Sequence, residues 1–176
     1  LNQLLPPKEI VSVDDGSTDS TLSVLNGVVR ERRVSSTKTH EEDTKKNKDN
    51  FALLREPSCG FVDELFPELK IVTKPNGGPA SARYFGARLA TAEFIAFTDS
   101  DCLPDRNWLQ ELLAGFDSPN VAGVGGSVKS VDDSLLGEYI DLLRVMEPAE
   151  NADGEIEYLI TANACFRREA LLAANL

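Results

Sequence analysis

Histidine and cysteine are scarce in this sequence. Its 176 residues include one histidine, His40, and three cysteines. His40 falls in a polar segment without hydrophobic periodicity, which favours a solvated loop position over a catalytic one. The cysteines lie far apart and form no C-x-x-C pair, which argues against a zinc site and against a disulfide framework. Chemistry carried out by this chain would therefore depend on carboxylates, basic residues and metal.

Basic residues and long apolar runs are also in short supply. The 18 Lys and Arg residues against 29 Asp and Glu residues give a formal net charge of −11, so the chain lacks the basic stripe that nucleic-acid binding needs. No apolar run approaches the roughly 20 residues of a membrane-spanning helix, and no signal peptide is visible at the start. We therefore expect no nucleic-acid partner, no membrane span in this chain and a cytoplasmic location.

Short apolar segments alternate with helical patterns along most of the chain. Strands are expected at residues 9–13, 69–73, 93–97, 121–128 and 158–161. This alternation predicts one α/β domain, with a mainly parallel sheet and helices on both faces. Residues 30–66 interrupt the pattern, and their charged and polar start leads us to expect a flexible charged insertion there.

A tight loop and a helix start follow the second expected strand. Residues 74–79 hold two glycines between prolines, and Pro79 suits the first turn of a helix that reaches about residue 89. The apolar spacing in this helix predicts a buried stripe of Ala82, Phe85, Gly86 and Leu89. Arg83 lies near the helix N-terminus, where the macrodipole favours an anion. Arg83 fits two roles equally well, contact with a bound anion or pairing with a nearby acid.

Acidic residues end two of the expected strands. Asp14 and Asp15 follow the first strand, and Asp99 and Asp101 follow the third. Parallel strands present their carboxyl ends at one edge, so these acids should converge there with the loop after the second strand. Carboxylates held close together repel each other unless a cation or hydrogen-bond donors lie between them, and Mg²⁺ or Mn²⁺ is a usual cation. Solvated surface acids are the alternative in so acidic a chain.

Three other protein classes with acidic motifs fit this sequence less well. A haloacid-dehalogenase-type phosphatase would carry threonine or valine where Leu103 stands, on its first strand. An EF-hand calcium loop would need an oxygen ligand at Leu103 and glycine at Pro104. A receiver-type signalling domain could use Asp14 and Asp15, but the next acidic strand end lies about eighty residues further on, too far for that compact fold.

The motifs together resemble the nucleotide-sugar-binding part of family 2 glycosyltransferases, which have the GT-A fold. Residues 9–21 resemble the family's strand and acidic turn, and residues 76–86 its Asn-x-Gly…Ala-Arg-x-x-Gly stretch. Residues 97–102 are similar to its Asp-x-Asp motif, and residues 163–168 to its Asn-x-Ala-x-Arg-Arg segment. Each motif is moderately specific, whereas their order and spacing together are strongly so. The resemblance covers the chain from about Leu4 to Leu176, except the insertion.

The resemblance implies a donor site at the strand ends. Asp15 would accept a hydrogen bond from the nucleobase, Lys74 and Arg83 would lie near the base and phosphates, and Asp99 would bind the ribose or sugar. Asp101 would hold the Mg²⁺ or Mn²⁺ that bridges the diphosphate. The donor-binding residues implied in this way are Asp14, Asp15, Lys74, Asn76, Gly77, Arg83, Asp99 and Ser100.

The activity implied is metal-dependent transfer of a sugar, with inversion, from a UDP- or GDP-linked donor to an unidentified acceptor. A hexosyltransferase of polysaccharide or glycoconjugate biosynthesis would fit. The family's first strand and its catalytic base are expected before Leu1 and after Leu176, so the catalytic residue is unknown. The alternative is a non-catalytic nucleotide-sugar-binding or regulatory domain that lacks the base. Association with the cytoplasmic face of a membrane would depend on parts outside this chain.

Overall fold

The computed structural model of the chain describes residues 3–37, 67–131, 134–143, 146–147, 156 and 158–174. Strands and helices alternate through most of them, which confirms the predicted α/β class. The elements in chain order are β1 Glu9–Asp14, α1 Thr21–Thr37, β2 Glu68–Thr73, α2 Pro79–Leu89, β3 Phe94–Phe97, α3 Trp108–Ala114, β4 Gly123–Gly125, α4 Leu135–Leu142, the 3₁₀ turn η1 Thr161–Asn163, β5 Ala164–Arg167 and α5 Arg168–Ala173. No helix in these described ranges is long and apolar enough to cross a membrane.

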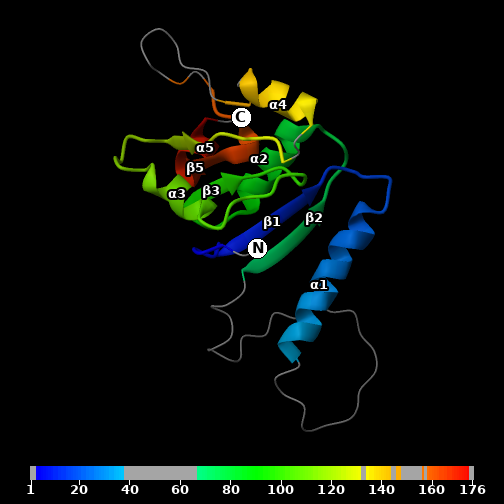
Figure 1. Cartoon of the computed structure of the whole chain (residues 1–176). Coiled ribbons are helices and arrows are strands. Elements are labelled where there is room, and N and C mark those ends of the chain that lie inside the picture. Colours follow the sequence, from blue (N-terminus) through cyan, green and yellow to red (C-terminus); the bar gives the residue numbers. More distant parts are fainter. Residues whose placement is uncertain are drawn as a thin grey trace, which may run out of the picture.

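The described strands form two sheets. β1 and β2 pair in parallel, from Glu9 opposite Glu68 to Asp14 opposite Thr73. In the other sheet β5 lies between β3 and β4 and is antiparallel to both, so β3 and β4 run in the same direction. Figure 1 shows β1 and β2 side by side between α1 and the elements around β3 and β5. The carboxyl ends of β3 and β4 therefore share one edge of their sheet.

Helix α2 packs against both sheets. Its Ala87 forms a buried cluster with Ala90 and with Ile95 of β3. On the side facing β1, a Cβ on Gly86 would stand 3.2 Å from the Val13 side chain, so the glycine allows close contact. The predicted buried stripe is only partly right, because Phe85 and Leu89 are each 38% exposed. Ala87 and Ala90 are the buried residues here, at 1% and 7% exposed.

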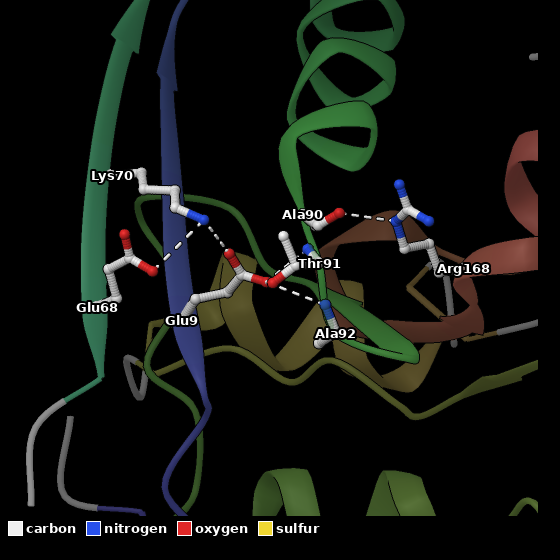
Figure 2. A network of polar contacts seen from close by, with 7 residues as sticks. All are labelled: Glu9, Glu68, Lys70, Ala90, Thr91, Ala92 and Arg168. Carbon is white, nitrogen blue, oxygen red and sulfur yellow. Dashed lines mark hydrogen bonds and ion pairs between the residues drawn. The ribbon is translucent and has the colours of Figure 1, made fainter. Parts of the chain in front are cut away.

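A polar network ties β1 to its neighbours at the end opposite Asp14 (Figure 2). The Glu9 carboxylate accepts hydrogen bonds from Lys70 of β2 at 2.5 Å and from the N–H groups of Thr91 and Ala92 at 2.6 and 3.0 Å. Burial of the carboxyl opposes its ionisation, but these donors outweigh that effect and hold the pKa of Glu9 at about 2. The charged Glu9 therefore links β1, β2 and the turn that precedes β3.

Several boundaries differ from those predicted. The expected strand at residues 158–161 is wrong: η1 begins at Thr161, and the strand is β5, six residues further along. Pairing with β3 on one side and β4 on the other decides this placement. Helix α1 runs to Thr37, so residues 30–37 of the expected insertion are helical. Residues 38–66 lie outside the described ranges, and a flexible insertion there stays a prediction.

Candidate functional site

Acidic and basic residues gather where β1, β2 and β3 end. Asp14 is the last residue of β1, Lys74 directly follows β2, and Asp99 lies two residues beyond β3. The Lys74 N–H donates to the Asp14 carbonyl at 3.0 Å, which continues the pairing of β1 and β2 by one residue. The loops that leave these strands therefore start from fixed positions.

The Asp15 carboxylate joins the loops after β1 and β2. It accepts a hydrogen bond from the ammonium group of Lys74, and others from the N–H groups of Gly77 at 3.1 Å and Gly78 at 2.7 Å. The bond from Lys74 is the main cause that lowers the pKa of Asp15. Gly78 is the N-cap of α2 with φ 86°, a conformation that favours glycine. The structure thus brings Asp15, Lys74 and Gly77 together at the start of α2.

Gly16 allows the two loops to approach each other. Its φ is +78°, and a Cβ at this position would stand 2.9 Å from the backbone nitrogen of Asn76. A residue with a side chain would be strained by its own backbone and by this contact. The turn after β1 therefore lies against Asn76, another residue of the implied donor site.

Asp14 occupies a different environment from the other acids. The residue is 3% exposed, and one carboxylate oxygen accepts a hydrogen bond from the Ser17 N–H at 3.3 Å. The other oxygen, Oδ2, is buried and has no hydrogen-bond partner among the residues that the structure describes. This burial places the Asp14 side chain beneath the turn rather than at its surface.

Arg83 and Asp99 form an ion pair between α2 and the segment after β3. The Arg83 guanidinium lies 2.9 Å from Asp99 Oδ1, and the two side chains are 31% and 43% exposed. Of the two roles that the sequence allows for Arg83, pairing with a nearby acid is therefore present. The guanidinium has five N–H donors, so the pair leaves donors for an anion as well.

The segment from Asp99 to Cys102 turns tightly. The Cys102 N–H donates to the Asp99 carbonyl at 3.2 Å, so Ser100 and Asp101 form the corner of the turn. Asp101 is exposed. Among the described residues, its carboxylate has one polar contact, with the Cys102 thiol 4.0 Å from Oδ1. The Asp101 carboxylate therefore faces solvent with oxygens available to a ligand.

The donor set at this turn fits one kind of metal site. Within the described part of the chain, no group of three or more His, Cys, Asp or Glu side chains could hold an ion by itself. Mg²⁺ is commonly held by one or two carboxylates together with substrate phosphates and water. An exposed Asp101 with Asp99 two residues away suits that arrangement and does not suit a cage built by protein alone.

Two features of this edge are absent from the sequence-based expectations. Of the hydrogen bonds that Gly77 and Gly78 donate to Asp15, the one from Gly78 is the shorter. The Gly-Gly pair before Pro79 was the sequence feature that could have indicated this contact. Asn163 accepts a hydrogen bond from the Trp108 indole at 2.8 Å. That contact joins residues 55 positions apart, so no local sequence pattern predicts it.

Comparison with known proteins identifies the family. Residues 57–172 match the Glycosyl transferase family 2. The chain belongs to this family. The match contains three of the four motif segments that carry the resemblance, whereas residues 9–21 precede it.

Two glycosyltransferases illustrate the similarity. The chain is 40% identical over 65 residues to the pre-mycofactocin glycosyltransferase of Mycobacterium tuberculosis, and this alignment covers 36% of the chain and 14% of that protein. It is 28% identical over 102 residues to an uncharacterized glycosyltransferase of Haemophilus influenzae, which covers 57% of this chain and 27% of that protein. The alignments thus span less than a third of either relative's length.

Proposed function

We propose that this family 2 glycosyltransferase domain binds a nucleoside-diphosphate sugar at the carboxyl ends of β1, β2 and β3 and serves its transfer to an acceptor. The observation that supports this most is the arrangement around α2. Asp15 and its hydrogen-bond donors Lys74, Gly77 and Gly78, here called the Asp15 cluster, lie at the helix N-terminus. The Arg83–Asp99 pair lies one to two turns further along the helix. One helix therefore fixes the spacing between the two groups, as a ligand that contacts both would require.

The Asp15 cluster is the proposed nucleobase end of the site. A carboxylate accepts hydrogen bonds from the N–H groups of uracil or guanine, and either base would compete with Gly77 or Gly78 for Asp15. Lys74 and Arg83 supply positive charge for the diphosphate. Such local cations are needed because the chain as a whole carries a net charge of −11 and repels anions.

The turn after β3 is the proposed diphosphate and sugar end. Asp99 keeps Oδ2 for a ribose or sugar hydroxyl while Arg83 holds Oδ1, and Ser100 lies between the two acids. Asp101 is the proposed ligand of Mg²⁺ or Mn²⁺. Bound there, the cation would supply Lewis-acid stabilisation of the negative charge on the departing diphosphate.

Transfer with inversion also needs a carboxylate base on the side of the sugar away from the diphosphate. Of the described acids at this edge, Asp14 is buried, Asp15 is held by Lys74, Asp99 is held by Arg83, and Asp101 is assigned to the metal. A donor-binding or regulatory domain without transferase activity is therefore the second candidate. Donor turnover in the presence of a panel of acceptors supports the first candidate, and donor binding without turnover supports the second.

Calorimetric titration with UDP-sugars and GDP-sugars, with and without Mn²⁺, tests the proposed site. We expect Mn²⁺ to raise the affinity for one donor class by about tenfold or more, a change of about 1.4 kcal/mol. The Asp101→Ala variant should lose this gain. Asp117→Ala, which removes an exposed aspartate after α3, is the matched control and should keep it. Donor binding that ignores both Mn²⁺ and Asp101→Ala would rule out the metal role.

A further inference from the structure

Asn163 stands at the middle of the sheet edge that carries the Asp99–Asp101 turn. It is the last residue of η1 and directly precedes Ala164 of β5. Ala164 pairs on one side with Phe97, the last residue of β3, and on the other with Gly125, the last residue of β4. Asn163 therefore lies beside the segments that leave both strands.

The Asn163 amide uses both of its ends. Its Nδ2 donates to the Ser127 carbonyl on the segment after β4 at 2.8 Å, and its Oδ1 accepts from the Trp108 indole N–H at 2.8 Å. Gly126 lies against the same amide, because a Cβ there would stand 2.5 Å from Asn163 Nδ2. The amide donates from one atom and accepts at another, so neither leucine nor aspartate reproduces both bonds.

Trp108 directly follows the connection between β3 and α3, which carries Asp99 and Asp101. This connection runs from Thr98 to Asn107, and Trp108 begins α3 directly after it. Gln3 holds the same end, since its Nε2 donates to the Asp105 carbonyl at 2.6 Å and its Oε1 accepts from the Leu109 N–H at 3.3 Å. The far end of the connection is thus fixed from two directions, whereas Asp101 itself projects into solvent.

We propose that Asn163 and Trp108 are positioning residues for Asp101. Their hydrogen bond fixes the end of the Asp101 connection against the sheet edge and so holds the carboxylate where a metal-bound diphosphate meets it. The inference rests on the proposed metal role of Asp101.

A purely structural role and a positioning role have different consequences. A bond that only stabilises the fold changes the free energy of unfolding and leaves the effect of Mn²⁺ on nucleotide binding unchanged. A bond that positions Asp101 changes the affinity measured with Mn²⁺ and leaves the affinity measured without metal as it was. The ratio of the two affinities therefore separates the roles without any assay of activity.

Trp108→Phe and Asn163→Leu are the test variants, and Asn107→Leu is the matched control. Trp108→Phe keeps an aromatic ring and removes the N–H. Asn107 neighbours Trp108, but its side chain bonds to Glu111 within α3. With UDP and GDP as probes, we expect both test variants to lower the Mn²⁺-dependent affinity about three- to tenfold, because each removes the hydrogen bond between Trp108 and Asn163. The double variant should be no weaker than Asn163→Leu alone, because Asn163→Leu already removes the bond to Trp108 together with the bond to Ser127.

The outcomes separate this inference from the proposed function. Denaturant titration of each variant first verifies that it is folded. If the wild type gains affinity with Mn²⁺ and Asp101→Ala loses the gain, while Trp108→Phe and Asn163→Leu keep it, the positioning role is overturned alone. The same holds if the two variants weaken binding equally with and without metal. If the wild type gains nothing from Mn²⁺, the metal role of Asp101 fails, and the positioning role fails with it.

Discussion

Gly16 and Gly27 occupy opposite environments. Gly16 has a positive φ in the turn after β1, and a Cβ there would meet Asn76 at 2.9 Å. Gly27 lies within α1, and apart from its own helix backbone and chain neighbours, none of the described residues would come within 4 Å of a Cβ there. The same substitution should therefore have opposite effects at the two positions.

We expect Gly16→Ala to lower the free energy of unfolding by more than about 1 kcal/mol, because alanine resists the left-handed conformation and crowds Asn76. Gly27→Ala should raise it by about 0.5–1 kcal/mol, because alanine favours the helix interior. Urea denaturation followed by circular dichroism measures both changes. A Gly16→Ala chain as stable as the wild type would show that the loops after β1 and β2 do not need this close approach.

Residues with a local signal at this edge were predictable, and residues with only distant contacts were not. Asp15, Lys74, Asp99 and Asp101 each follow an apolar strand pattern, so the sequence identifies them directly. The role of Asn163 depends on Trp108 and on the segment after β4, which no local spacing reveals. Of the two roles that the sequence allows for Arg83, the structure shows the ion pair with Asp99, and contact with an anion stays a prediction.

At the scale of elements, Glu9 connects three segments through one carboxylate (Figure 2). Its ordinary pKa of 4.5 is lowered to about 2 in the folded chain. Because the folded value is the lower one, ionised Glu9 stabilises the fold fully above about pH 4.5. This contribution is lost as the pH falls from there towards about 2.

Replacing Glu9 with glutamine tests this linkage. We expect Glu9→Gln to lower the free energy of unfolding at pH 7 by about 2 kcal/mol, because hydrogen bonds to a charged group are lost. Between pH 5 and pH 2.5 the variant should lose less stability than the wild type. Glu68→Gln is the control, since Glu68 contacts the same Lys70 at 3.5 Å with its side chain 67% exposed. An exposed pair should contribute less than about 1 kcal/mol. Parallel pH profiles for wild type and Glu9→Gln would contradict the assigned role.

Elements whose start is marked by a local sequence signal lie where the sequence predicts them. The position of β5 is set instead by its pairing with other strands. Pro79 marks the start of α2, and the helix runs from there to Leu89 as expected. In contrast, β5 lies in a segment with an asparagine at one end and two arginines at the other, and local composition favoured a strand before it. Its pairing with both β3 and β4 is a non-local effect that overrides this preference.

For the whole molecule, the order of motifs was more informative than composition. Alternating strands and helices predicted the α/β class, and four motifs in the right order predicted the family that the match over residues 57–172 confirms. The division into a parallel pair and a three-stranded sheet was not predictable, because strand order depends on contacts between distant segments. Helix α2 contacts both sheets, and Glu9 links β1 to the turn that precedes β3, so they hold the two sheets together.

The central claim is that this edge binds a nucleoside diphosphate through Asp15 at one end and a metal on Asp101 at the other. A crystal structure of the wild-type chain with Mn²⁺ and UDP, or GDP where that nucleotide binds, tests it most directly. We expect an anomalous manganese peak in direct coordination distance of an Asp101 carboxylate oxygen, with the base against Asp15. A nucleotide bound with its base away from Asp15, or with manganese remote from Asp101, would contradict the claim.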